Sequence, residues 1–429
     1  MRIERLYEST GRNLLRDLLK RNPDQYTEYE KGVREILSAV RERGDEALFE
    51  FTRKFDGAVI DSFTVKVTEE EIAEAYSLVD GELLRVIRKA LKNIRSYHEK
   101  QRQYSWFDSK PDGTMLGQKV TPLFRVGVYV PGGKAAYPSS VLMNIVPAKV
   151  AGVDEIVMAT PPGRDGRITP TTLVAAREAG ADVIYKAGGA QAVGALAYGT
   201  ESIPKVDKIV GPGNIYVALA KKAVYGDVSI DAIAGPSEIL VIADETANPR
   251  YVAADLLSQA EHDELASAVL VTDSGELAEK VSLEAERFTA ELSRGEIIRK
   301  SLDNYGCILI VEDMDAAVRA ANEIAPEHLE IQTKNPYDVM MRIRNAGAIF
   351  IGEYASEPLG DYFAGPNHVL PTNGTARFFS PLSVDDFIKK SSIIAYSKEA
   401  LSAVHKDIES FARAEQLTAH ANSIQVRFE

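Results

Sequence analysis

The chain of 429 residues has few of the residues that most often reveal chemistry by themselves: one cysteine, one tryptophan and six histidines. A single cysteine excludes an intramolecular disulfide, and six histidines can be considered one at a time. The formal net charge of −13, with no dense run of Lys and Arg against it, argues against a nucleic-acid partner. We expect a cytoplasmic protein, because no stretch reaches about 18 uncharged apolar residues and the N-terminus has no apolar secretory segment.

The hydrophobic content of 45% and the charged content of 26% are typical of a folded globular protein. On the usual prior of ~150 residues per domain, the length leaves room for about three domains. The first part of the chain, to about Ser105, has the 3.6-residue periodicity of helices. From about Val126, short β-rich runs alternate with helix-length segments, and a second alternating set begins near Glu238. This alternation predicts two α/β layers built from parallel βαβ units, with helical pieces at both ends.

Two glycine-rich turns invite comparison with nucleotide-binding loops. The first, after a predicted strand, fails as a phosphate-binding loop, because Gly133 intervenes before Lys134 and Ala135 stands where a hydroxyl would bind Mg²⁺. The second has Gly211 and Gly213 between a predicted strand and helix.

Asp231 follows that second turn at the distance of ~20 residues expected in a dinucleotide fingerprint. Tyr216, however, occupies the position of the third glycine. Tight strand-to-helix turns explain both glycine pairs about as well. NAD would therefore bind here only by a variant geometry.

A predicted helix after Asn248 and Pro249 has Gln259 at the border of its apolar stripe and His262 on the flank of that stripe. Burying an amide without a partner costs roughly 1–3 kcal/mol, so Gln259 must have one. A hydrogen-bonded core glutamine would explain Gln259 alone, but the i, i+3 pair with His262 favours a binding site.

The Glu327-His328 pair follows Pro326, which predicts the first turn of a helix. At such a turn both side chains can point into a cleft, which suits an acid/base pair. An exposed pair at a helix start is the alternative. Asp361 and His368 occur in a loop rich in Gly, Pro and Asn, a kind of loop that often carries function.

The remaining candidates lie near the C-terminus or in charged and apolar runs. Glu415 and His420 stand close together near the end of the chain, whereas we expect His98 and His405 at the surface of charged helices. Cys307 lies in an apolar strand run with no adjacent cation to lower its pKa, so we expect a core thiol. Two imidazoles and two oxygens from Gln, His, Asp and His could bind a divalent metal, best Zn²⁺, although no HExxH or CxxC spacing supports it.

Eight long motifs make the chain resemble the histidinol dehydrogenase family over essentially its whole length. They are VGVYVPGGKAAYPSSVLMN, AGGAQAVGALAYGT, KIVGPGNIYVALAK, IAGPSEILVIAD, LLSQAEHD, APEHLEI, GDYFAGPNHVLPT and LTAHANSIQVR. The resemblance implies a zinc- and NAD-dependent enzyme with two Rossmann-like domains in an aldehyde-dehydrogenase-like architecture, without the standard glycine fingerprint. It also implies an intertwined homodimer in which a C-terminal histidine completes the partner subunit's site.

The resemblance assigns roles residue by residue. The zinc ligands would be Gln259, His262, Asp361 and His420, the last reaching across the dimer, and the acid/base pair would be Glu327 and His328. The substrate would contact Ser237, His328, Glu415 and the zinc ligands, and less certainly the neighbourhood of His368. The NAD contacts would be Tyr129, Gln191 and Asn214.

The same resemblance suggests four segments. We expect 1–129 to be a helical part that joins the first α/β domain and 130–236 to be a second, NAD-side Rossmann-like domain. Residues 237–381 would complete the first domain with the metal and acid/base residues, and 382–429 would be a dimerisation segment.

The expected reaction oxidises L-histidinol to L-histidine through the aldehyde, as the last step of histidine biosynthesis. His328 would remove the alcohol proton, Glu327 would activate the water that adds to the aldehyde, and zinc would hold the substrate. Three alternatives stay open: Mn²⁺ as the metal, a paralogous zinc/NAD dehydrogenase acting on another alcohol such as a sulfonated one, and a zinc hydrolase or non-catalytic metal-binding protein.

Overall fold

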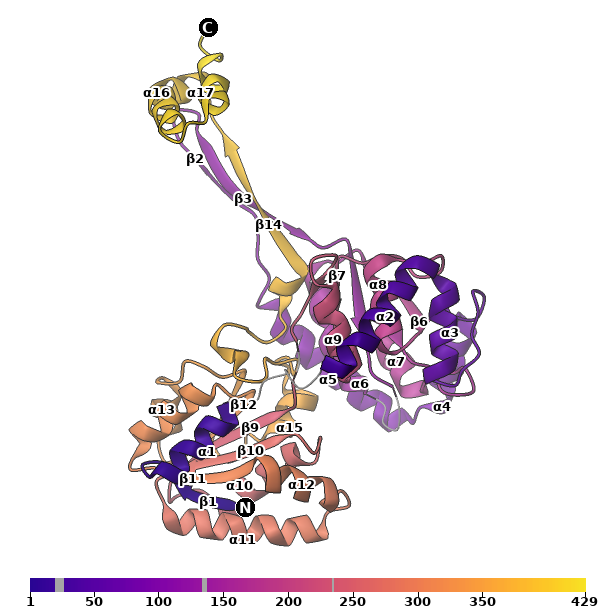
Figure 1. The fold of residues 1–429 in the computed structure, drawn as a ribbon, viewed down its shortest axis with the longest axis vertical. Coiled ribbons are helices and arrows are strands. Elements are labelled where there is room, and N and C mark those ends of the chain that lie inside the picture. The colour runs from indigo at the N-terminus through magenta and orange to yellow at the C-terminus, as the bar shows by residue number, and fades with distance from the viewer. Residues whose placement is uncertain (20–26, 133–136, 234) are drawn as a thin grey trace. The chain divides into compact units, whose positions relative to one another are not determined.

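The computed structural model describes residues 1–19, 27–132, 137–233 and 235–429 (Figure 1). These residues form two compact units. The first contains Met1–Gln101 and Leu123–Phe387, and the second contains Arg102–Pro122 and Ile388–Glu429. Within the described ranges, no helix is long and apolar enough to cross a membrane.

The first unit contains a parallel five-stranded sheet in the order β6-β5-β4-β7-β8. Its strands are β4 (Arg125–Tyr129), β5 (Glu155–Thr160), β6 (Val183–Lys186), β7 (Lys208–Val210) and β8 (Ser229–Ile230). The crossover helices are α6 (Pro138–Ala151), α7 (Pro170–Ala179), α8 (Gly189–Tyr198) and α9 (Ile215–Val224). The β-rich runs after Val126 are therefore strands, as the alternation predicts.

Four N-terminal helices cover these crossover helices from outside: α2 (Thr27–Arg43), α3 (Asp45–Phe55), α4 (Glu69–Leu78) and α5 (Gly81–Glu99). α2 and α3 share an apolar cluster with α8 and α9, whereas α4 and α5 share one with α6 and α7. We call this whole assembly the five-stranded lobe. Its outer helices give the sheet a second helical layer on each face.

A second parallel sheet, in the order β1-β11-β10-β9-β12-β13, forms the six-stranded lobe. Its strands are β1 (Arg2–Arg5), β9 (Glu238–Ala243), β10 (Ser267–Thr272), β11 (Gly306–Ile310), β12 (His328–Gln332) and β13 (Ala348–Ile351). Its helices are α1 (Ser9–Leu19), α10 (Pro249–Ala260), α11 (Gly275–Glu291), α12 (Gly295–Tyr305), α13 (Met314–Ile324), α14 (Pro336–Met340) and the short α15 (Glu357–Leu359). Two apolar clusters, one on each face, fill the space between this sheet and its helices.

Two parallel α/β sheets with flanking helices confirm the predicted fold class. Of the segment 1–129, β1 pairs with β11 in the six-stranded sheet, while α2–α5 pack on the five-stranded lobe. The four segment borders stay predictions.

The second unit is built from an antiparallel sheet and two helices. Its strands β2 (Trp106–Ser109), β3 (Met115–Pro122) and β14 (Ile388–Ala395) pair in the order β14-β3-β2. The chain then continues into α16 (Lys398–Ala414) and α17 (Thr418–Gln425), which pack on each other.

The burial of two residues, Cys307 and His98, can be compared with the prediction from the sequence. Cys307 is fully buried on β11, as predicted. His98 is also fully buried, so the prediction of a surface histidine is wrong. It ends the buried stripe of α5 that runs through Ile87, Ala90 and Ile94, and its ring nitrogens contact Gln101 and Asn367. The charged neighbours that suggested exposure lie on the other faces of this amphipathic helix.

Candidate active site

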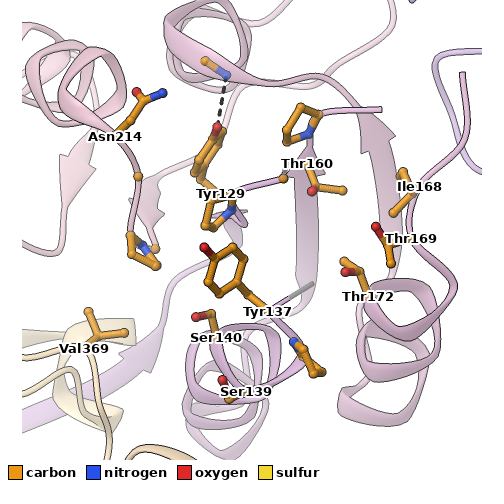
Figure 2. A pocket seen from close by; sticks show the side chains of 18 of the residues that line it. Tyr129, Tyr137, Ser139, Ser140, Thr160, Ile168, Thr169, Thr172, Asn214 and Val369 are labelled. Carbon is orange, nitrogen blue, oxygen red and sulfur yellow. Dashed lines mark hydrogen bonds between the residues drawn. The ribbon is translucent and has the colours of Figure 1, made fainter. Parts of the chain in front are cut away.

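A cavity of about 1750 Å³ is lined by residues of both lobes of the first unit. From the five-stranded lobe it receives residues at the carboxyl ends of strands, such as Tyr129 of β4 and Thr160 of β5 (Figure 2). From the six-stranded lobe it receives residues at the amino ends of strands, such as Ser237 before β9 and His328 at the start of β12.

Three predicted cofactor contacts meet at the carboxyl edge of the five-stranded sheet. The Tyr129 hydroxyl accepts a hydrogen bond of 3.1 Å from the Gly189 amide at the start of α8, as Figure 2 shows. The Gln191 side chain is 1% exposed, and its Nε2 has no hydrogen-bond partner among the described residues. Asn214 caps α9 through Oδ1, which accepts from Tyr216 at 3.1 Å. The Tyr129 phenol and the amide side chains of Gln191 and Asn214 therefore line the same part of the cavity.

The turn before Asn214 is held by a buried ion pair. Lys221 and Asp231 form this pair, with side chains that are 3% and 5% exposed. Lys221 donates to the Gly211 carbonyl at 2.9 Å, and Asp231 accepts from the Gly211 amide at 2.8 Å. Gly211 has φ of +118°, and a Cβ there would collide with the Tyr129 carbonyl. Two side chains therefore fix both polar groups of one peptide position that only glycine can occupy.

These contacts give Asp231 a different role from the one that its spacing suggested. Its spacing from Gly211 suggested the carboxylate that binds a ribose in a dinucleotide fingerprint, but both its oxygens are used inside the protein. Asp231 therefore supports the turn instead of contacting a ribose. In the other glycine-rich turn, Gly133 and Lys134 lie outside the described residues.

Glu327 and His328 are buried at the cavity wall, where β12 begins. The prediction that they start a helix is wrong, because His328 opens a strand that pairs with β9 and β13. The backbone of Glu238 orients both side chains. Its N–H donates to Glu327 Oε2 at 2.9 Å, and its carbonyl lies 3.0 Å from His328 Nδ1.

The contact with a carbonyl also fixes the tautomer of His328. Because a carbonyl oxygen only accepts, Nδ1 must carry the proton, which leaves the lone pair of a neutral ring on Nε2. Nε2 has no hydrogen-bond partner in the part of the chain that the structure describes, and it lies 3.6 Å from Asp361 Oδ1. This is the geometry of a general base with its basic atom free to meet a ligand.

Burial and neighbouring charges shift the pKa of both groups. Burial raises the pKa of Glu327 to about 8. Burial by itself lowers the pKa of His328, but the Glu327 and Asp361 carboxylates outweigh it and raise that pKa. The ring acts as a base only in its neutral form, and a cation bound to Asp361 would offset the negative charge that favours the protonated form. A carboxyl and an imidazole that compete for one proton in a dry pocket are suited to proton transfer.

A candidate metal group lies beside this pair. His262 follows the end of α10, and its ligating atom lies within 4.8 Å of carboxylate oxygens of Asp361 and Glu357. Asp361 is on a π-helical turn, Gly360–Ala364, a feature often found at functional sites. Gln259 is 1% exposed, and its Oε1 has no hydrogen-bond partner within residues 1–19, 27–132, 137–233 and 235–429. An orphan oxygen beside an imidazole and carboxylates fits a divalent cation such as Zn²⁺.

Ser237 and His368 complete the described wall of the cavity. His368 Nδ1 lies 3.0 Å from the Asp361 carbonyl, and its Nε2 lies 3.4 Å from the Ser140 hydroxyl at the start of α6. His368 therefore connects the turn that carries Asp361 with the five-stranded lobe.

Glu415 and His420 belong to the second unit. Glu415 directly follows α16 and His420 lies on α17, and both are exposed. Their predicted roles in substrate and metal binding stay predictions.

Sequence reasoning missed Glu357, which the structure adds to the metal group. Glu357 is buried and accepts a hydrogen bond of 2.9 Å from the Ser258 hydroxyl on α10. Its place four residues before Asp361, one helical turn away, is the signal that could have identified it.

The chain is similar to known proteins over nearly its full length. A family model described as histidinol dehydrogenase matches residues 19–428. Histidinol dehydrogenase of Bacillus subtilis (strain 168) is 60% identical over 410 residues, which are 95% of this chain and 96% of that protein. Histidinol dehydrogenase of Halalkalibacterium halodurans is 58% identical over 412 residues, 96% of this chain and 97% of that protein. The crystal structure of histidinol dehydrogenase from Elizabethkingia anophelis has a TM-score of 0.94 at 37% identity and covers 100% of this chain and 98% of its own.

Proposed function

This chain belongs to the histidinol dehydrogenase family and is an oxidoreductase, and from that membership we propose that it oxidises L-histidinol to L-histidine with NAD⁺. Two hydride transfers and one water would carry the alcohol through the aldehyde to the acid, the last step of histidine biosynthesis. One observation carries the proposal: the backbone N–H and carbonyl of one residue, Glu238, orient a carboxyl and an imidazole on a cavity whose other wall holds Tyr129, Gln191 and Asn214.

His328 is the proposed base of the first oxidation. Its Nδ1 proton is committed to the Glu238 carbonyl, so Nε2 accepts the alcohol proton. Glu327, held through Oε2 by the Glu238 amide, is the proposed base for the water that adds to the aldehyde. Because Cys307 is fully buried in β11, we propose a hydrated aldehyde and no thioester.

The proposed metal is Zn²⁺, bound by Gln259, His262, Asp361 and His420 of the partner subunit, with Mn²⁺ as the alternative. The orphan Gln259 oxygen and the closeness of His262 to Asp361 support three of these ligands. When bound, zinc would hold the amine and imidazole nitrogens of the substrate and fix its orientation. Ser237, His328 and Glu415 are the further proposed substrate contacts.

The proposed cofactor contacts are Tyr129, Gln191 and Asn214. Two observations support them: the Gln191 amide nitrogen has no partner among the described residues, and all three residues lie at the carboxyl edge, where open parallel sheets bind ligands. Residues 130–236 would form the domain that binds NAD, and residues 237–381 would form the part that carries the metal and acid/base residues.

We further propose a cytoplasmic homodimer built through 382–429. Large apolar side chains of the second unit are exposed, among them Trp106, Phe107, Ile394 and Phe411. Exposed apolar groups gathered on one unit are typical of an association surface. Mixing His328→Asn with His420→Asn subunits tests whether the active site is shared between the two subunits. If His420 serves the partner's site, mixed dimers regain activity in one of two sites, whereas a site completed within one chain gives no recovery.

NADH formation from L-histidinol, with and without a chelator, tests the function. We expect two NADH per histidinol, loss of turnover on chelation, recovery on adding Zn²⁺, and an unchanged fold throughout. The absence of NADH formation by metal-loaded protein would contradict the proposal. The relatives reported above favour histidinol over a sulfonated alcohol, and a substrate panel measures that preference directly.

A further inference from the structure

One face of β12 is polar although the strand lies inside the six-stranded sheet. His328, Glu330 and Gln332 alternate along this face and are 3%, 1% and 4% exposed. Leu329 and Ile331, on the opposite face, pack in an apolar cluster. Burial of polar and charged groups is costly unless each finds a partner. The proposed reaction uses His328 but gives no task to Glu330 or Gln332.

Those two side chains join a third, Asp255 of α10. Gln332 Nε2 donates to Asp255 Oδ2 at 2.7 Å and to Glu330 Oε2 at 3.1 Å, so one amide bridges two buried carboxyls. Glu330 Oε1 accepts from the Glu357 amide at 2.9 Å, also buried. This group, which we call the Asp255 cluster, therefore ties together α10, β12 and the start of α15.

The elements tied in this way are those that carry the proposed metal ligands. Asp255 is one helical turn before Gln259 on α10, so both side chains lie on the same helix face. The Glu357 amide begins the short segment that reaches Asp361 four residues later. Each attachment point of the cluster is thus about one turn away from a ligand. A shift at the cluster would change the separation of the ligands.

The protonation of the cluster indicates which substitution is conservative. Burial and the Asp255 carboxyl raise the pKa of Glu330 well above its ordinary value. A glutamine at this position keeps an acceptor for the Glu357 amide and a donor in place of the protonated carboxyl, and it gives up the 3.1 Å hydrogen bond from Gln332. Glu330→Gln is therefore the close substitute, and Glu330→Ala removes the connection.

We propose that Asp255, Glu330 and Gln332 are positioning residues that hold α10 and the 357–361 segment at the spacing that the metal ligands require. The inference rests on the proposed zinc site. Residues that support ligands from behind typically change metal affinity by about 10- to 100-fold when removed. The cluster therefore controls zinc retention and histidinol binding, and it does not act on the substrate itself.

The experiment compares zinc release, by competition with a chromogenic chelator, in the wild type and in Glu330→Ala, Glu330→Gln and Ser301→Ala. Ser301 is the matched control, because its hydroxyl makes an equally buried hydrogen bond, to the Ala266 carbonyl, in the same lobe. We expect Glu330→Ala to release zinc about 10- to 100-fold faster and to raise the KM for histidinol. Glu330→Gln should restore both values to within a few-fold, and all variants should bind NAD⁺ as the wild type does.

The outcomes separate this inference from the function it rests on. Zinc release by Glu330→Ala equal to that of Ser301→Ala, or no rescue by glutamine, overturns the positioning role and leaves the proposed function intact. Wild-type protein that binds no zinc yet oxidises histidinol overturns this inference together with the proposed zinc site, whereas metal-loaded wild type that forms no NADH overturns the proposed function. If Glu330→Ala does not fold, Gln332→Leu decides the same question: faster zinc release than Ser301→Ala supports the role, and equal release overturns it.

Discussion

The two lobes of the first unit contribute opposite edges of their sheets to one cavity. The five-stranded lobe presents carboxyl ends, where Tyr129 ends β4 and the Gly211 turn follows β7. The six-stranded lobe presents amino ends, where Ser237 precedes β9 and His328 begins β12. The first arrangement follows the general rule for open parallel sheets, and the second departs from it.

The chemical content of the two edges differs as well. On the five-stranded side the groups are glycine backbone, a phenol and amides, and the buried charges of Lys221 and Asp231 compensate each other. On the six-stranded side the charges are not compensated in this way, and burial raises the pKa of Glu327 to about 8 and of Glu357 to about 7. One edge presents backbone and neutral hydrogen-bonding groups, and the other presents carboxyl groups whose pKa values are raised. Substitutions on the two sides should therefore have different kinetic effects.

The largest expected effect is that of His328→Asn. Loss of a general base typically lowers the rate by about 10²- to 10⁴-fold, so kcat should fall by that factor while the Kd for NAD⁺ stays unchanged. Steady-state NADH formation and a cofactor titration measure the two quantities. His405→Gln, on α16, is the control and should leave both unchanged. A loss of less than tenfold would remove His328 from the role of base.

Glu327→Gln should have a large but selective effect. The amide keeps the acceptor for the Glu238 N–H but cannot take a proton from water, so oxidation of the aldehyde should slow by about 10²-fold or more. Oxidation of the alcohol should slow less. Single-turnover assays started from histidinol and from histidinaldehyde separate the steps, and equal losses in both would contradict the division of labour between the pair.

On the side of the five-stranded lobe, Lys221→Met should leave Asp231 as an uncompensated buried charge. Removing one partner of a buried ion pair destabilises a protein by about 3–5 kcal/mol. Because Lys221 also holds the Gly211 carbonyl, its loss should loosen the turn and raise the KM for NAD⁺ about tenfold, while the zinc content stays unchanged. Denaturant unfolding and kinetics measure both effects. The double variant Lys221→Met/Asp231→Leu should have a larger free energy of unfolding than Lys221→Met alone. If the KM for histidinol rises instead of that for NAD⁺, the turn does not serve the cofactor side.

The smallest effect concerns Asp56, which lines the cavity on the side of the five-stranded lobe. Burial raises its pKa to about 6, and its Oδ2 has no hydrogen-bond partner from the described chain. Because the folded state favours the protonated acid, ionisation lowers stability as the pH rises from about 4 to about 6, and the penalty is complete above that range. Asp56→Asn should therefore raise Tm at pH 8 and change it little at pH 4. Equal shifts at both values would show that the carboxyl is not strained by burial.

Sequence patterns predicted the strands with a continuous apolar stretch, such as β9 and β10, because a short apolar run rich in Val and Ile is typical of a buried strand. They failed at β12, where every second residue is polar and Pro326 suggests a helix start. The difference is that the partners of Glu330 and Gln332 lie on α10 and α15, far away in the sequence.

The site shows the same limit. The residue types and spacing of Gln259 and His262 were enough to propose them as ligands. Glu357 could have been proposed from its place four residues before Asp361, but the Lys221–Asp231 pair became visible only through its contacts. Asp231 even had the right spacing for a different task. A motif specifies which groups are available, and the fold decides whether they face a ligand or each other.

The edge strand β1 has a consequence for biosynthesis of the chain on the ribosome. Arg2 pairs with Cys307, so about 300 residues are translated before the first strand can meet its neighbour. In that interval the strands β4–β8, which are contiguous in the chain, can pair among themselves. Vectorial synthesis thus favours completion of the five-stranded lobe first, with the N-terminal strand added as one of the late events.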